Sequence, residues 1–108
     1  MNLLLENYLA DVEYPEASGI EQLQMLERRS ELAEMEYTLS PLEKKQLAEA
    51  DRKLALQADK VLAELSRFAN LADERERLQP PANEWWWYLD VLVRAPAVPI
   101  HSYQLVTP

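Results

Sequence analysis

The chain has 108 residues, contains no cysteine and carries a formal net charge of −8 at pH 7. This length suits one domain that buries its own core without the support of a metal or a disulfide. The missing thiols exclude disulfides, thiolate metal sites and cysteine catalysis, and no apolar run approaches the roughly 20 residues of a membrane span. We therefore expect a cytoplasmic protein that does not insert into a membrane.

The negative charge is concentrated in the first forty residues. This segment contains nine acidic side chains and only two basic ones, Arg28 and Arg29. Residues 41–79 contain eight acidic and eight basic side chains, so their charges balance. A field of this sign repels phosphate backbones, so we expect no binding of nucleic acid. It favours encounter with a basic protein surface, although a role in solubility alone would also account for it.

The first two predicted elements are helices. Apolar side chains at helical spacing predict a short amphipathic helix over residues 2–13, which Pro15 prevents from continuing. Ser18 and Glu21 have the spacing of a capping box, in which each side chain bonds the backbone N–H of the other residue. A second helix is therefore expected from there to about Tyr37.

A second capping box opens the third element. Ser40 and Glu43 enclose Pro41, whose fixed φ suits the first turn of a helix. From Pro41 to Leu78 leucine and alanine recur at threes and fours without a break, which predicts one long helix. Because the connection before Ser40 is so short, we expect the second and third helices to form an antiparallel hairpin.

The expected length of this third helix raises a question of burial. A helix over residues 41–78 would be about 57 Å long, whereas the helix before it would cover only about 28 Å. The apolar side chains of its C-terminal half, around Val61 to Ala72, must therefore be buried by another element. The N-terminal helix, the tryptophan-rich segment or a second copy of the chain could supply that cover, or the helix could break near Asn70, a mediocre helix former.

Three consecutive tryptophans and a tyrosine, residues 85–88, follow the double proline at 80–81. We predict a helix over residues 84–94, with a strand as the alternative because aromatic and β-branched residues dominate. Trp85 shares a helical face with apolar residues and should be buried, whereas Trp86 or Trp87 should be partly exposed or in an interface. Residues 1–94 should form the domain, followed by an extended, proline-containing arm over residues 95–108.

No catalytic, metal or cofactor motif is present in the sequence. The single histidine, His101, has no cysteine partners for a zinc site, and Gly19 is the only glycine, so phosphate-binding loops are absent. Glu27, Glu31 and Glu34 share one helical face, but the Glu-x-x-His motif of metal-binding bundles is missing. The stripe is expected to be solvated or to meet a basic partner, since like charges at this spacing repel one another.

These observations predict an all-α fold and a non-catalytic, acidic protein–protein interaction or assembly module that self-associates and uses no cofactor. In size, charge and layout the chain resembles antitoxins, which cover basic toxins, and this resemblance implies a neutralising partner of a basic protein as the alternative. An enzyme that uses carboxylates is a third hypothesis. The predicted interface residues lie on the long helix, in the tryptophan cluster and on the acidic stripe: Val61, Leu65, Phe68, Ala72, Trp86, Trp87, Glu27, Glu31 and Glu34.

Overall fold

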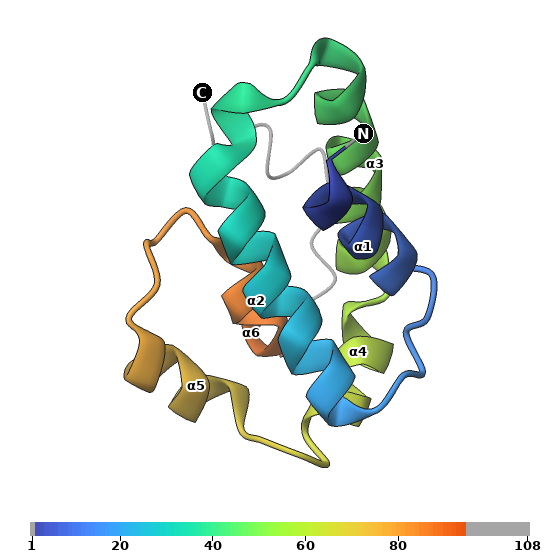
Figure 1. The fold of residues 1–108 in the computed structure, drawn as a ribbon. Helices are drawn as coiled ribbons and strands as arrows, with labels where there is room; N and C mark the ends of the chain where they lie inside the picture. Colours follow the sequence, from blue (N-terminus) through green and yellow to red (C-terminus); the bar gives the residue numbers. More distant parts are fainter. Residues whose placement is uncertain (1, 95–108) are drawn as a thin grey trace, which may run out of the picture.

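The computed structural model describes residues 2–94, which fold into α-helices and 3₁₀ turns and contain no β-strand in that range (Figure 1). The predicted all-α class is confirmed, and residues 85–94 are helical rather than extended. The predicted arm over residues 95–108, with His101, lies outside the described residues. The elements are α1 (Leu3–Asp11), α2 (Gly19–Met35), η1 (Glu36–Thr38), α3 (Pro41–Leu56), α4 (Ala58–Leu65), α5 (Leu71–Leu78), η2 (Trp85–Tyr88) and α6 (Leu89–Arg94).

Helix α2 contacts most of the other elements. It packs against α1, α4 and the 3₁₀ turn η2, while α1 also packs against α3. Figure 1 shows α2 crossing the front of the molecule, with α6 behind it. Both α2 and α3 pack against α1, and the two-helix hairpin expected from their short connection is not confirmed.

The helix starts follow the capping chemistry. Ser40 Oγ accepts a hydrogen bond from the backbone N–H of Glu43 at 3.1 Å, and the Glu43 carboxylate accepts one from the backbone N–H of Ser40 at 2.9 Å. This is the complete capping box predicted for α3. At α2, the Ser18 side chain accepts from the N–H of Glu21 at 3.4 Å, so the serine half of that box is present.

We expect Ser40→Ala to lower the free energy of unfolding by about 1 kcal/mol, because the start of α3 loses its cap. The exposed Ser66, which caps no helix start, provides the control: Ser66→Ala should change stability by about 0.5 kcal/mol or less. Denaturant unfolding of both variants measures the difference. An unfolding midpoint unchanged by Ser40→Ala would show that the box does not stabilise α3.

The prediction of a single long helix over residues 41–78 is wrong, because the chain bends at Gln57 and turns after Leu65. At Gln57 the backbone leaves helical geometry, and the side-chain amide donates to the backbone oxygen of Val12 at the end of α1 (3.3 Å). At the second break Asn70 caps α5 by accepting from the N–H of Asp73 at 3.0 Å. The alternative of a break near Asn70 is therefore confirmed.

The C-terminal part of the predicted long helix is covered within the chain. Helix α4 packs against α2 and α6, and both Val61 and Leu65 are buried. Of the covers considered from the sequence, the tryptophan-rich segment folds back and provides one through α6. A second copy of the chain is therefore not needed to bury this face.

The only glycine lies where α2 meets the end of α4. Gly19 is buried, and a β-carbon at this position would lie 2.5 Å from the backbone oxygen of Glu64 and 2.6 Å from Cβ of Phe68. Real β-carbons do not approach other atoms this closely, and one of the two neighbours is backbone. The first turn of α2 therefore reaches α4 only because residue 19 has no side chain.

We expect Gly19→Ala to destabilise the protein by about 1–3 kcal/mol, because α2 and α4 must move apart. This result would oppose the usual gain in stability when glycine is replaced by alanine in a helix. The exposed Gln24 on the same helix gives the matched control, and Gln24→Ala should change stability by about 0.5 kcal/mol or less. Thermal unfolding of the two variants tests this, and a stabilised Gly19→Ala variant would contradict it.

Candidate functional site

One serine joins α2 to the tryptophan turn. Ser30 Oγ accepts hydrogen bonds from the indole nitrogens of Trp86 (3.0 Å) and Trp87 (2.8 Å). The same hydroxyl donates to Oε1 of Glu84 at 2.8 Å. A hydroxyl has one proton to donate and two lone pairs to accept with, so these three bonds use the full capacity of Ser30. Both buried indole N–H groups are satisfied in this way, as buried polar groups require.

The burial of the tryptophans differs from the prediction. Trp86 and Trp87 are buried, at 3% and 2% exposed, whereas Trp85 is only partly buried. The expectation of a buried Trp85 beside an exposed Trp86 or Trp87 is therefore wrong. Residues 85–88 form the 3₁₀ turn η2 instead of the α-helix assumed from the sequence, and the rings of Trp86 and Trp87 lie inward, where their indole N–H groups bond Ser30 of α2.

A buried guanidinium lies beside this cluster. Arg29 is 4% exposed, and its Nε and Nη2 atoms donate to the two carboxylate oxygens of Asp51 at 2.8 and 3.0 Å. The guanidinium carbon lies 4.2 Å from the centre of the Trp86 ring, and the Tyr8 hydroxyl donates to the same carboxylate at 2.7 Å. Burial and the charge of Asp51 raise the pKa of Tyr8. These contacts join α1, α2, α3 and η2.

A second ion pair fixes the segment that follows the double proline. Arg75 on α5 donates to both carboxylate oxygens of Asp90 on α6, at 2.6 and 3.2 Å, and to the backbone oxygen of Trp87 at 2.8 Å. Burial alone would raise the pKa of Asp90, but the hydrogen bonds and charge of Arg75 outweigh it and lower that pKa. The tryptophan turn is thus held from α5 as well as from α2.

The acidic stripe of α2 borders a hollow of about 460 Å³, which opens between this helix and the double proline after α5. Glu27, Glu31 and Glu34, which their spacing places on one face of α2, all line it, and Glu84 lines it from the segment after the double proline. We call this space the acidic hollow. The rest of its lining is mainly apolar: Leu78, Pro80, Pro81 and Trp87, with Ser30 and Gln79.

Glu84 differs from the other three glutamates in its burial. It is 8% exposed, whereas Glu27, Glu31 and Glu34 are exposed to solvent. Within residues 2–94 its carboxylate receives one hydrogen bond, from Ser30, and it lines the acidic hollow. In the described part of the chain, neither carboxylate oxygen of Glu84 is both fully buried and without a hydrogen-bond partner, so a donor from outside can still reach this group. Its partly satisfied carboxylate makes Glu84 the side chain of this hollow that a cation would stabilise most.

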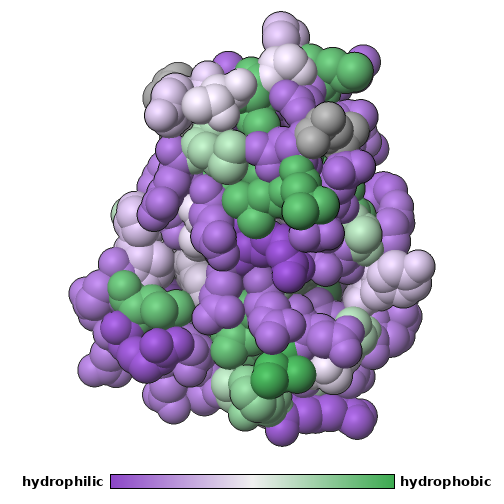
Figure 2. Space-filling model, viewed as in Figure 1, coloured by the Kyte–Doolittle hydropathy of each residue, from purple (hydrophilic) through white to green (hydrophobic). Residues whose placement is uncertain are grey.

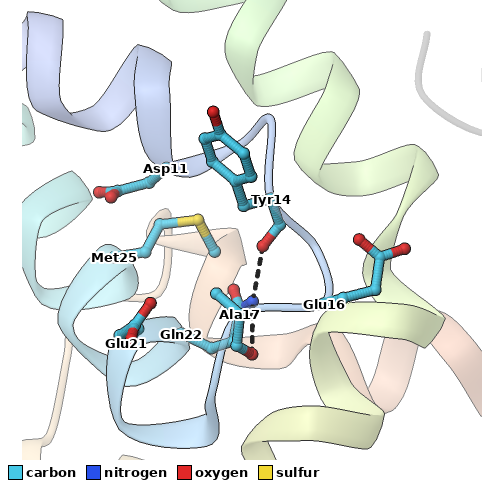
Figure 3. Close-up of a pocket in the computed structure, with 7 residues that line it drawn as sticks. All are labelled: Asp11, Tyr14, Glu16, Ala17, Glu21, Gln22 and Met25. Carbon is cyan, nitrogen blue, oxygen red and sulfur yellow. Dashed lines mark hydrogen bonds between the residues drawn. The ribbon is translucent and has the colours of Figure 1, made fainter.

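A second hollow, of about 360 Å³, lies at the turn between α1 and α2 (Figure 3). The buried amide of Gln22 donates there to the backbone oxygens of Tyr14 (3.0 Å) and Ala17 (3.1 Å). The carboxylate of Asp11 pairs with the guanidinium of Arg28. Because these polar groups hold the turn in place, we assign this hollow a structural role.

The predicted interface residues of the former long helix are divided between core and surface. Val61 and Leu65 are buried inside the chain, and so are Trp86 and Trp87. Phe68 is 53% exposed, and Ala72 is exposed. Four of the nine predicted interface residues are therefore not at the surface, while the acidic stripe on α2 is.

The described part of the chain contains no helix that is long and apolar enough to cross a membrane. Between residues 2 and 94 no three acidic or histidine side chains lie close enough together to hold a metal ion. On the face of the molecule shown in Figure 2, hydrophobic residues form separate patches among hydrophilic ones. We therefore take the acidic hollow, which three predicted glutamates and the mostly buried Glu84 line, as the candidate functional site.

No protein-family model, curated protein or solved structure matches this chain. Its function therefore has to be inferred from the fold and from the geometry of the acidic hollow.

Two residues of this site were missed from the sequence. Ser30 shares a helical face with the apolar residues Leu26 and Ala33, and a serine in such a stripe is a signal for a buried hydrogen bond. Glu84 directly precedes the three tryptophans, and its neighbours in the sequence do not mark it for burial. Its partner Ser30 lies 54 residues away in the sequence, so no local pattern links the two.

Proposed function

We propose that this protein is a non-catalytic binding module whose acidic α2 face receives a basic surface of a protein partner. The observation that carries the proposal is the acidic hollow, where three exposed glutamates of α2 meet the buried Glu84. Complementary charge speeds encounter and selects partners of the opposite sign. Neutralisation of a basic protein, as by an antitoxin, is one form of this function, and the absence of cysteine fits a reducing compartment such as the cytoplasm.

Calorimetric titration with a ten-residue peptide of alternating lysine and alanine tests this function at low and at physiological salt. The triple variant Glu27→Gln, Glu31→Gln, Glu34→Gln should bind the peptide about tenfold more weakly than the wild type, since it removes three complementary charges. A matched triple variant, Glu6→Gln, Glu49→Gln, Asp59→Asn, changes the net charge equally at exposed positions of α1, α3 and α4.

The matched variant should retain most of the affinity. Equal losses in the two triple variants would mean that the peptide senses only the net charge, and the acidic residues would then serve solubility. Failure of the wild type to bind at low salt would also overturn the proposed function.

Self-association is a separate part of the proposal. Its original basis was an uncovered half of a long helix, but α2 and α6 cover Val61 and Leu65. Of the four predicted seam residues, Phe68 and Ala72 are exposed and remain available for a homodimer contact. Sedimentation equilibrium at high micromolar concentration tests this, and a protein that stays monomeric there would remove self-association from the proposal.

A further inference from the structure

We propose that the acidic hollow takes one lysine or arginine side chain of the partner and that Glu84 pairs with its charge. This inference rests on the proposed function, because it names the group that the same site receives. In this proposal Glu84 forms the ion pair with the bound side chain, and the three exposed glutamates of α2 attract that side chain through their negative charge.

The two kinds of lining suit the two parts of a basic side chain. Lysine and arginine bury their aliphatic stems against apolar surfaces while the charged end seeks polar partners. In the acidic hollow Leu78, Pro80 and Pro81 supply apolar surface, and Glu84 supplies a carboxylate beside Trp87. The volume of about 460 Å³ falls within the roughly 300–1,000 Å³ of sites for small ligands, so one such side chain has room.

The burial of Glu84 points to a cation independently of the exposed stripe. More than nine-tenths of Glu84 is buried, yet Ser30 is the one hydrogen-bond donor to its carboxylate among residues 2–94. A carboxylate can accept about four hydrogen bonds, and Glu84 lines the hollow, so acceptor capacity remains for a donor that enters it. An ammonium or a guanidinium would use that capacity and neutralise the buried charge, which makes a charge-assisted bond there stronger than one at the exposed glutamates.

The bonding pattern also provides a reporter. Ser30 donates to Glu84 and accepts from the indole N–H groups of Trp86 and Trp87, so a cation at Glu84 alters the electron density at the acceptor that both indoles share. No hydrogen bond from the Trp85 indole to Ser30 occurs in this part of the structure, which makes Trp85 an internal control. The three indole N–H signals of an NMR spectrum can be assigned with single tryptophan-to-phenylalanine variants.

The experiment is an NMR titration of the full chain with Nα-acetyl-lysine amide and Nα-acetyl-arginine amide as probes. Nα-acetyl-norleucine amide serves as the uncharged control probe. We expect saturable shifts of the Trp86 and Trp87 indole signals with the charged probes, little shift of Trp85, and none with norleucine. A response to one charged probe alone would identify the preferred side chain. The inference is overturned if neither charged probe moves these signals saturably.

Two variants separate Glu84 from the general charge of the surface. Glu84→Gln keeps an acceptor for Ser30 but removes the charge, and it should lose the shifts and bind the basic peptide about tenfold more weakly. Glu31→Gln, at an exposed position of the same hollow, should weaken the peptide about twofold. Equal shifts in wild type and Glu84→Gln would overturn the inference.

A third variant remains informative if Glu84→Gln does not fold. Leu78 lies at the rim of the hollow and is 37% exposed, so Leu78→Lys should fold and place a tethered ammonium there. It should move the two indole signals without a probe and block the probe response, and a variant that still responds fully would overturn the inference.

If the peptide binds the α2 face while the indoles do not respond, the inference fails and the proposed function stands. If the charged probes shift the indoles but the peptide does not bind, the proposed function fails instead.

Discussion

Trp86→Ala should lower the free energy of unfolding by about 3–5 kcal/mol, which is the usual cost of replacing a buried aromatic side chain with alanine. The ring is 3% exposed, and its indole nitrogen donates to Ser30. Its face also lies under the guanidinium of Arg29. The variant therefore loses packing, a buried hydrogen bond and a cation–π contact together. Chemical denaturation measures the effect.

Trp85→Ala is the control for this prediction, because it removes the same side chain from the neighbouring position. Trp85 is only partly buried and packs edge-on against Trp86 with ring centres 5.8 Å apart. Its removal should cost less than half as much as the removal of Trp86. Trp86→Phe should cost about 1 kcal/mol through the lost hydrogen bond, with most of the packing retained. A larger loss in Trp85→Ala than in Trp86→Ala would restore the order expected from the sequence.

The starts of α2 and α3 could be predicted from the sequence because capping is local chemistry. Ser40 and Glu43 are three residues apart, and both reciprocal bonds depend only on the first turn of α3. Asn70 also bonds the N–H three residues further on, but from the sequence only a break in the long helix near this residue was considered. Short-range hydrogen bonds of this kind need no knowledge of the rest of the fold.

The bend at Gln57 and the burial of the tryptophans could not be predicted in the same way. Gln57 bonds the backbone of Val12, which is 45 residues away in the sequence, and neither glycine nor proline marks the position. The order of burial among the tryptophans depends on a 3₁₀ turn whose indoles bond Ser30, more than fifty residues earlier. Tertiary contacts decide both features, and the helical period gives no sign of them.

Only one part of the candidate site, the row of glutamates on α2, could be predicted from the sequence. The spacing of Glu27, Glu31 and Glu34 is enough to place them on one face of α2. The hollow beside them exists only because the segment after α5 folds back against this helix, held by Arg75 and Asp90. A pattern within α2 therefore predicts the charged stripe, whereas the hollow and the burial of Glu84 are properties of the fold.

The other large effect is expected at Arg29, where Arg29→Met should cost about 3–5 kcal/mol because it leaves a largely buried carboxylate without its cation. The side chain of Arg29 is 5% exposed and that of Asp51 is 20% exposed. Burial alone would lower the pKa of Arg29, but the hydrogen bonds and charge of Asp51 outweigh it and raise that pKa, so the guanidinium stays charged. After the substitution, Asp51 keeps only the hydroxyl of Tyr8 among these partners.

A double-mutant cycle separates the ion pair from the packing of the arginine. If the cost of Arg29→Met comes mainly from the unpaired Asp51, the double variant Arg29→Met, Asp51→Ala should cost less than the sum of the single variants, by about 1–3 kcal/mol. Arg28 is the matched control, since it is the adjacent arginine and pairs with Asp11 where 27% of each side chain is exposed. Arg28→Met should cost about 1 kcal/mol or less. Denaturant unfolding of all four variants and the wild type measures these effects. Strictly additive effects, or equal losses for Arg28→Met and Arg29→Met, would show that the buried pair does not join α2 to α3.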